Sequence, residues 1–244
     1  MQTEQNTDTP SGSLEDGIAA PYDFSIMDIF RETWQRTNGL KGSVLGAIAL
    51  VFIIMLVITF IAAFATGIEN FAEPESFSIV AALLNLVVSL ASYPFFAGII
   101  MMGLHRAVGA PVNFKMAFAY FNYSVPIIIA SICMSIMIML GMFLLVIPGI
   151  YLSIAYMFTF ALIVDKNMDF WQAMETSRKA VTQHWFKFFF ISLIMVAIYS
   201  ISLIPLGLGL IWTIPMFIAL QGVLYRRVFG ITSVQTPPNE TKAF

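Results

Sequence analysis

The sequence predicts an all-α, polytopic membrane protein with six transmembrane helices in three hairpins. Each hairpin follows a cytoplasmic amphipathic helix at the membrane interface. Of the 244 residues, 59% are hydrophobic and 11% are charged, whereas a soluble domain carries about 25% charged residues. The apolar residues form long stretches, and the basic residues lie between these stretches or at their ends. Together these observations favour repeated crossing of a bilayer.

The N-terminal residues differ from the rest of the chain in composition. Residues 1–22 are polar, acidic and rich in Gly, Ser, Thr and Pro, which predicts a disordered cytoplasmic tail. They do not have the basic-then-apolar pattern of a signal peptide. A membrane domain is predicted over residues 23–230, followed by a second cytoplasmic tail over residues 231–244. The single cysteine, Cys133, excludes an intrachain disulfide and a multi-cysteine metal site.

Four stretches are long and apolar enough to supply the crossings, which need about 20 residues each. Residues 43–66 and residues 77–104 carry no charge and predict one helix each. Residues 125–164 are also uncharged and long enough for two helices, with a break at Pro148-Gly149. Residues 185–223 carry only Lys187 and predict two more helices, separated at Pro205-Leu206-Gly207.

The basic residues predict the orientation. They are Arg31, Arg36, Lys41, Arg106, Lys115, Lys166, Arg178, Lys179, Lys187, Arg226, Arg227 and Lys242. All of them fall on one side of a six-helix thread, and the longest connection on the other side carries Glu69, Glu73 and Glu75. The positive-inside rule therefore predicts that both termini are cytoplasmic, which requires an even number of crossings.

A repeated segment precedes each predicted hairpin: "FSIMDIFRETW", "VNFKMAFAYF" and "MDFWQAMETS". Each begins with a residue suited to a helix N-cap, namely Ser25, Asn113 and Asp169. Apolar residues then recur at helical spacing, which predicts three amphipathic helices in the cytoplasmic interface. The repeating units span approximately residues 24–109, 112–165 and 168–230, and units of this kind bury their faces against one another.

Several side chains are predicted to anchor the protein where the helices meet the headgroups. They are Trp34, Arg106, Trp171, Arg226 and Arg227. On the third interfacial helix, Glu175 is spaced to pair with Arg178 and Lys179. Asp165 has two interpretations: it anchors a helix end, or it contacts a substrate or partner.

Residues 146–188, "VIPGIYLSIAYMFTFALIVDKNMDFWQAMETSRKAVTQHWFKF", resemble the YciC-like family of uncharacterised bacterial inner-membrane proteins. They are also similar to the membrane portion of some glycerophosphoryl diester phosphodiesterases. The likeness is carried by Pro148, Gly149, Asp165, Lys166, Ala173, Ser177 and Trp185. It implies a six-helix protein of the bacterial inner membrane. The soluble phosphodiesterase domain is not part of this sequence, so that activity is not expected.

The spans offer little chemistry. Their central parts contain no charged residue, which argues against a proton-coupled transporter, a voltage sensor or a charged selectivity ring. Asn85, Ser89 and Ser92 share one face of the second span, and with Gln221 they predict either interhelical hydrogen bonds or a polar crevice. Gly98 and Gly103 would allow a neighbouring helix to approach closely.

No catalytic or metal-binding pattern is found. His105 and His184 lie at cytoplasmic helix ends without a paired Asp, Glu or Cys at ligand spacing. No Ser-His-Asp order, zinc-protease motif or glycine-rich phosphate loop occurs. The sequence therefore predicts no catalytic residue, no metal, no cofactor and no nucleic-acid partner.

Two functions remain in competition, with an intramembrane enzyme as a third. The first is an accessory, scaffold or lipid-organising subunit whose partners are membrane lipids, other membrane subunits or further copies of the chain. The second is a transporter or channel for an apolar or amphipathic solute. A membrane-traversing or laterally open cavity lined by Asn85, Ser89, Ser92 and Gln221 would favour transport. A solid bundle with a flat, Phe-rich flank would favour a scaffold.

Overall fold

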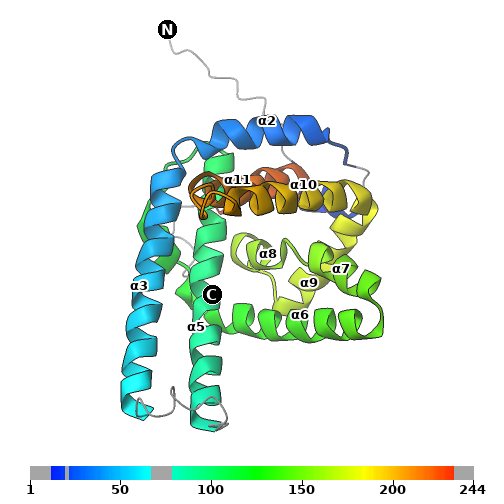
Figure 1. Cartoon of the computed structure of the whole chain (residues 1–244). Coiled ribbons are helices and arrows are strands. Elements are labelled where there is room, and N and C mark those ends of the chain that lie inside the picture. The colour runs from blue at the N-terminus through cyan, green and yellow to red at the C-terminus, as the bar shows by residue number, and fades with distance from the viewer. Residues whose placement is uncertain (1–11, 20–21, 67–78, 234–244) are drawn as a thin grey trace, which may run out of the picture.

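The computed structural model describes residues 12–19, 22–66 and 79–233 (Figure 1). Within these ranges every regular element is a helix. In chain order the elements are α1 (Leu14–Ala19), α2 (Ile26–Thr37), α3 (Lys41–Thr66), α5 (Ile79–Ala107), the 3-10 helices η1 (Phe114–Phe118) and η2 (Phe121–Tyr123), α6 (Ser124–Leu144), α7 (Val146–Ala155), α8 (Thr159–Asp165), α9 (Phe170–Gln183), α10 (Trp185–Leu203) and α11 (Leu210–Phe229).

In the described part of the chain, five helical segments are long and apolar enough to cross a membrane. They are Lys41–Ile61, Leu86–Ala107, Phe114–Leu144, Val146–Asp165 and Trp185–Leu203. The chain therefore has the helices of a membrane protein, as the sequence predicted. α11 is not one of the five, and six crossings in three hairpins remain a prediction.

The connections that the sequence assigned to the cytoplasmic side lie together in the structure. Polar contacts between them join Arg106 to Arg36, Lys166 to Thr232, and Lys187 to Asp23. The other ends of the helices diverge. In Figure 1, α3 and α5 lie side by side and extend downward, whereas α6 runs across the view and meets α7 at the right. The helices therefore do not form one bundle with parallel axes.

Both ends of α11 lie beside the charged side of the molecule. Near its start, the ring of Trp212 lies 5.9 Å from Nζ of Lys41, which begins α3. Near its end, Arg226 contacts Glu32 of α2. α11 therefore lies along α2 and crosses α5. The pattern of hydrophobic stretches in the sequence does not predict this orientation of α11.

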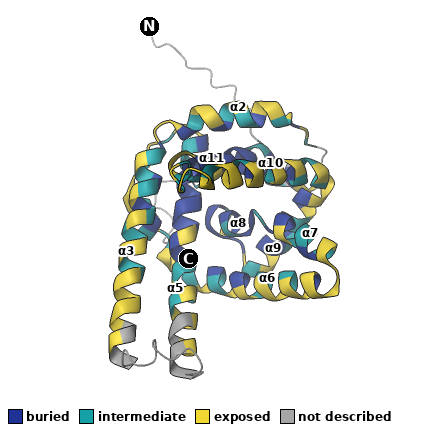
Figure 2. Ribbon diagram, viewed as in Figure 1, coloured by how far each residue is buried: buried dark blue, intermediate teal, exposed yellow. Residues whose placement is uncertain are grey.

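Large apolar side chains cover the outer surface of the diverging helices. Figure 2 shows exposed residues along the lower part of α3 and on the outer side of α6. They include Phe60 and Phe64 in α3 and Met139 and Phe143 in α6. Such a surface is expected of helices that face lipid.

The contact between α5 and α11 depends on two glycines. A Cβ on Gly222 would overlap the carbonyl oxygen of Gly103, and a Cβ on Gly103 would overlap that of Ile218. A third glycine, Gly98, faces η1, where an added Cβ would lie 2.6 Å from the carbonyl oxygen of Ala117. Small residues of this kind let helix backbones approach closely, as the sequence predicted for Gly98 and Gly103.

The second predicted interfacial helix is wrong. Residues 114–123 form η1 and η2 instead of an amphipathic α-helix, although Oδ1 of Asn113 accepts a capping hydrogen bond from the Lys115 amide at 3.1 Å. Phe118 and Phe121 both pack edge-to-face on Phe95 of α5. This tertiary packing accounts for a local conformation that helical spacing alone did not predict.

The first and third interfacial segments are α-helices, α2 and α9. Trp34 and Trp171 are 58% and 57% exposed, as anchors at the headgroups would be. The Asp169 side chain caps α9 by accepting from the Trp171 amide, whereas Ser25 at the start of α2 makes no side-chain cap. The apolar stripe of α9 nevertheless packs against α7 and α8, because Met174, Ser177 and Val181 are buried. α9 therefore presents this stripe to the protein, not to lipid.

The described part of the predicted N-terminal tail is packed against the membrane domain. The Gly12 amide donates to the carbonyl oxygen of Arg226 at 3.0 Å, and α1 contacts α11. Gly12 and Gly17 lie so close to the backbone of residues 227 and 228 that a Cβ would not fit without movement. The composition of this polar segment predicted disorder. Its close packing against the end of α11 explains why residues 12–19 are ordered instead. Residues 1–11 and the predicted tail beyond residue 233 lie outside the described residues.

Candidate functional site

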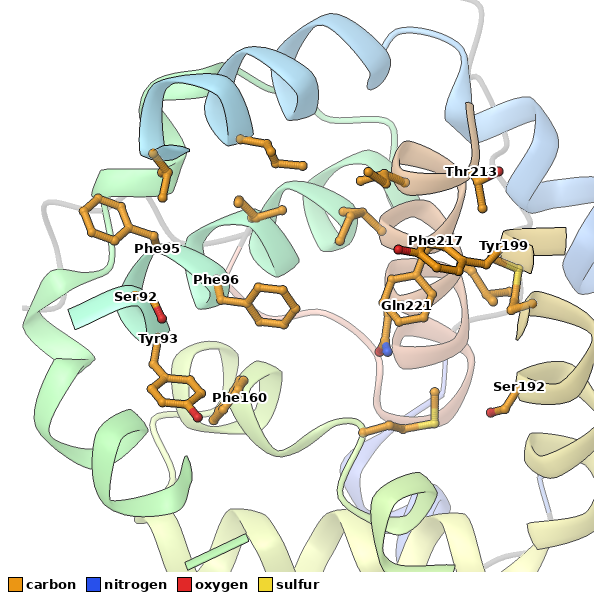
Figure 3. Close-up of a pocket in the computed structure, with 18 of the residues that line it drawn as sticks. Ser92, Tyr93, Phe95, Phe96, Phe160, Ser192, Tyr199, Thr213, Phe217 and Gln221 are labelled. Carbon is orange, nitrogen blue, oxygen red and sulfur yellow. The ribbon is translucent and has the colours of Figure 1, made fainter. Parts of the chain in front are cut away.

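A cavity of about 860 Å³ lies between α3, α5, α10 and α11, with the start of α8 at one side (Figure 3). The fold explains its position. The cavity-facing segments, residues 92–99 of α5 and 213–221 of α11, end just before the Gly103–Gly222 contact. The two helices are in contact at these glycines and separate in the direction of their N-termini, which leaves space beside α3 and α10.

Each of these cavity-facing segments contains a proline. Pro94 lies inside α5 and Pro215 lies inside α11. Proline lacks an amide hydrogen and its ring clashes with the preceding helical turn, so it kinks a helix. Both therefore occur where α5 and α11 diverge.

The walls of the cavity are almost entirely apolar. Aromatic rings and methionines dominate: Phe52, Met55, Phe95, Phe96, Met157, Phe160, Met195 and Phe217. None of the described residues that line it is charged. Methionine side chains adapt to irregular shapes, so the walls suit flexible hydrocarbon chains better than a rigid polar solute.

Among the described lining residues, six polar side chains interrupt this apolar surface, and two of them, Ser92 and Thr213, have hydrogen-bond partners. Thr213 donates to the carbonyl oxygen of Gly209 at 3.2 Å, and its hydroxyl also lies 2.5 Å from that of Ser202. Ser92 donates to the carbonyl oxygen of Ser89 at 2.6 Å. Their hydrogen bonds are thus made within or between the helices themselves.

Gln221 is different. Its side chain points from α11 into the cavity (Figure 3) and is only 8% exposed. In the part of the chain that the structure describes, its amide forms no hydrogen bond. A buried side-chain amide normally has a partner. Tyr93, Ser192 and Tyr199 also line the cavity without a hydrogen bond in the described structure, but they are more exposed. Gln221 is therefore the most deeply buried polar group in this cavity that is free to bind another molecule.

The predicted polar crevice is found in part. Ser92 and Gln221 both line the cavity, whereas Ser89 does not, and the side chain of Asn85 lies outside the described residues. The sequence interpretation missed Ser192 and Tyr199, two wall residues of α10. Their spacing of seven residues places them on one face of α10, but two polar residues do not mark which face of an otherwise apolar helix turns inward.

Asp165 joins the end of α8 to the segment after α11. Its Oδ2 accepts from the Tyr225 hydroxyl at 2.9 Å, and its Oδ1 accepts from the Thr232 and Ser233 amides at 2.9 and 2.7 Å. Lys166 lies 3.4 Å from the same carboxylate. With these partners, Asp165 fits the first of its two interpretations, anchoring of a helix end.

The predicted interfacial arginines have internal partners. Arg226 is 1% exposed, so it does not reach the headgroups as predicted. It donates to Glu32 Oε1 at 2.6 Å and to the carbonyl oxygen of Ala107 at 2.5 Å. Arg227 donates to the other Glu32 oxygen at 2.9 Å, and Arg106 donates to the carbonyl oxygen of Arg36. These arginines connect α2, α5 and α11.

The charge of Glu32 is favoured by this arrangement. Burial alone would raise the pKa of Glu32, but the hydrogen bonds and positive charges of Arg227 and Arg226 outweigh burial and lower it. The carboxylate therefore remains ionised at neutral pH. Its role is to neutralise two arginines that would otherwise lie unpaired among packed helices.

Apart from Asp165 and Lys166 at the end of α8, the residues of the family-like motif lie where α6, α7, α9 and α10 pack together. Pro148 and Gly149 lie in the first turn of α7, where Gly149 lies against Gly141 of α6. Ser177 of α9 donates to the carbonyl oxygen of Ala155 at 2.7 Å, next to the buried Ala173. Trp185 starts α10 and packs on α7 through Tyr151. The motif therefore marks a packing junction away from the cavity.

The histidines make local contacts. His184 packs edge-to-face on Tyr22, and Nδ1 of His105 lies 2.9 Å from the carbonyl oxygen of Met101. Over the described ranges, no group of three or more His, Cys, Asp and Glu residues is arranged to hold a metal ion.

Comparisons of the chain with protein-family models, curated proteins and solved structures find no match. The resemblance to the YciC-like family thus remains a prediction from residues 146–188.

Proposed function

We propose that this integral membrane protein binds the apolar part of a lipid-like molecule in the cavity between α3, α5, α10 and α11. The observation that carries the proposal is the 860 Å³ cavity with apolar walls and no charged side chain among its described lining residues. Its volume falls in the range of about 300–1,000 Å³ that is typical of small-molecule sites. The proposal assigns no catalytic step to the protein.

Binding of this kind is consistent with a lipid-organising role. A hydrocarbon chain gains little from leaving a bilayer for an equally apolar pocket, so selectivity must come from close packing and from polar groups. The aromatic and methionine side chains of the walls supply the packing. A protein with such a site would hold one class of lipid in preference to the bulk bilayer.

The direct test uses a lipid with a photoreactive acyl chain, with the protein reconstituted in nanodiscs. Ser192 lines the cavity, and the neighbouring Leu193 is 52% exposed and does not. Ser192→Trp should fill the cavity and reduce labelling of cavity residues severalfold, whereas Leu193→Trp should label like the wild type. Equal labelling of both variants would exclude the cavity as the binding site.

A second candidate function is transport of the bound molecule. It is supported by Pro94 and Pro215, which interrupt two of the helices that line the cavity. Transporters often bind substrates at interrupted helices. The test uses liposomes with a fluorescent lipid in one leaflet. If the protein transports the lipid, the wild type should move it to the other leaflet and Ser192→Trp should not. A protein that binds the lipid without such a flux is a lipid-organising protein.

The accessory or scaffold role would use the outer surface instead. Phe60, Phe64 and Phe143 are exposed there and could contact another membrane subunit or a further copy of this chain. Purification from native membranes in mild detergent, followed by identification of the co-purifying proteins, tests this role. Isolation of the chain with lipid but without a protein partner would favour the cavity-based proposal.

We also propose that both ends of the chain are cytoplasmic, in a bacterial inner membrane. The contact between Gly12 and Arg226 supports an even number of crossings between the two ends, and the ion pair between Asp23 and Lys187 supports an even number between those two residues. The basic residues near these contacts favour the cytoplasmic side. In a Cys133→Ala background, cysteines placed at Ser13 and Gln172 should both react with an impermeant reagent only in inverted vesicles.

A further inference from the structure

We propose that the side-chain amide of Gln221 is the polar anchor of the cavity, and that its ligand is a neutral amphipath with a carbonyl or hydroxyl group. This inference rests on the proposed function of the cavity and specifies the class of ligand. It starts from the side chain of Gln221, a residue only 8% exposed, whose amide points into the cavity and has no hydrogen-bond partner in the described structure.

The backbone of Gln221 is held in place by the residue that follows it. The next residue, Gly222, lies against the backbone of Gly103, and this contact holds α11 against α5. A buried polar group without a hydrogen bond is unfavourable. A ligand that bonds to the amide therefore gains an interaction that the protein alone does not make.

The other polar groups of the wall are less suited to this role. Ser92 and Thr213 already make hydrogen bonds to backbone carbonyl oxygens in or next to their own helices, and Ser192, which has no hydrogen bond in the described structure, is less buried than Gln221. Tyr199 is 47% exposed, and Tyr93 is intermediate in exposure, so their hydroxyls are more accessible from outside. Gln221 is the more deeply buried group, and a ligand's polar group must therefore enter the cavity to reach it.

The chemistry of the site favours a neutral ligand. An ionised headgroup in a low-dielectric site needs an opposite charge nearby, and the described lining residues include none. A glutamine amide offers two N–H donors and one carbonyl acceptor. It can donate to an ester or ketone carbonyl, or accept from a hydroxyl, without any charge on the ligand.

The test measures the apparent affinity of a photoreactive diacylglycerol, a neutral probe, for protein in nanodiscs. Gln221→Met keeps the length of the side chain and removes the amide. It should lower the affinity about fivefold to tenfold, the equivalent of one hydrogen bond. Gln172→Met is the matched control, because Gln172 is exposed on α9, and it should bind like the wild type.

The Ser192→Trp variant separates the two proposals. If Ser192→Trp loses binding while Gln221→Met binds like the wild type, the cavity binds lipid but Gln221 is not its anchor. If Ser192→Trp binds like the wild type, the proposed function itself is wrong. A photoreactive fatty acid, ionised at pH 8, should bind more weakly than the diacylglycerol, and stronger binding would overturn the assignment to a neutral ligand.

A measurement on the unaltered protein keeps the inference testable if Gln221→Met fails to fold. Hexadecanol and hexadecane differ by one hydroxyl group and can each compete with the photoreactive diacylglycerol. Hexadecanol should compete about fivefold to tenfold better, for the same reason as above. Equal competition would show that the cavity recognises hydrocarbon alone and would overturn the anchor role of Gln221.

Discussion

The guanidinium of Arg226 in α11 lies 2.6 Å from the carboxylate of Glu32 in α2, and it also donates to the carbonyl oxygen of Ala107 at the end of α5. One side chain thus joins three helices that are far apart in sequence. Arg226 is 1% exposed and the Glu32 side chain is 13% exposed, so this ion pair is largely removed from solvent. It helps to hold together the end of the molecule from which the helices diverge.

Glu32→Gln should strongly destabilise the protein, because it leaves buried Arg226 without a counter-charge. Loss of one partner of a buried pair costs about 3–5 kcal/mol. Glu175→Gln is a matched control, since its pair with Arg178 is more than one-third exposed on both sides and such pairs contribute about 0–1 kcal/mol. Unfolding in detergent by a chemical denaturant measures both. Equal losses would show that the Glu32 pair does not hold the helices together.

The contribution of Glu32 to stability should depend on pH. Its pKa is lowered in the folded protein by Arg227 and Arg226 despite its burial. A group with a lowered folded pKa stabilises the protein above its unfolded pKa, about 4.3, and this stabilisation is lost as the pH falls through the folded value. The difference in unfolding free energy between wild type and Glu32→Gln should therefore be constant near neutral pH and shrink below about pH 4. A difference that grows on acidification would contradict this assignment.

Gly222→Ala should separate α5 from α11, because the new methyl group would overlap the carbonyl oxygen of Gly103. Overpacking of this kind costs about 1–3 kcal/mol. Gly42→Ala in α3 is the control: no atom lies within 4 Å of its added Cβ, and alanine favours a helix by up to about 1 kcal/mol. Thermal unfolding should show a lower midpoint for Gly222→Ala and no loss for Gly42→Ala. A stable Gly222→Ala variant would mean that the helices are not in close contact.

Asp165→Ala should release the segment that follows α11. It removes the acceptor for the Thr232 and Ser233 amides and for the Tyr225 hydroxyl. Hydrogen exchange of a peptide that contains residues 231–233 should become faster, because its amides lose their partner. Asp28→Ala, at an exposed position on α2, should leave this exchange unchanged. Unaltered exchange in Asp165→Ala would remove the anchoring role of Asp165.

Much of the helical structure was predictable from composition along the chain. The uncharged stretch at residues 43–66 corresponds to α3 (Lys41–Thr66), and the break predicted at Pro205-Leu206-Gly207 lies between α10 and α11. The break near Pro148-Gly149 falls slightly earlier, at Leu145, where the backbone is extended between α6 and α7. Helix interiors and breakers are local properties, so a local pattern can find them.

The candidate site was predictable only in part, for a physical reason. Ser92 and Gln221 stood out as polar residues in apolar spans, and both line the cavity. Ser192 and Tyr199 did not, because α10 is apolar nearly all round. A helix of that composition carries no amphipathic stripe to show which face turns inward.

From the sequence alone came the hydrophobic helices, the clustering of basic residues near one set of connections, and the lack of charge in the spans. These follow from the cost of placing polar groups in hydrocarbon, which acts on each segment separately. Only the tertiary structure decided that Arg226 is buried against Glu32, that α11 crosses α5 at Gly103, and that a cavity remains beside Gln221. Such contacts join residues more than one hundred positions apart, and they depend on which helix faces meet.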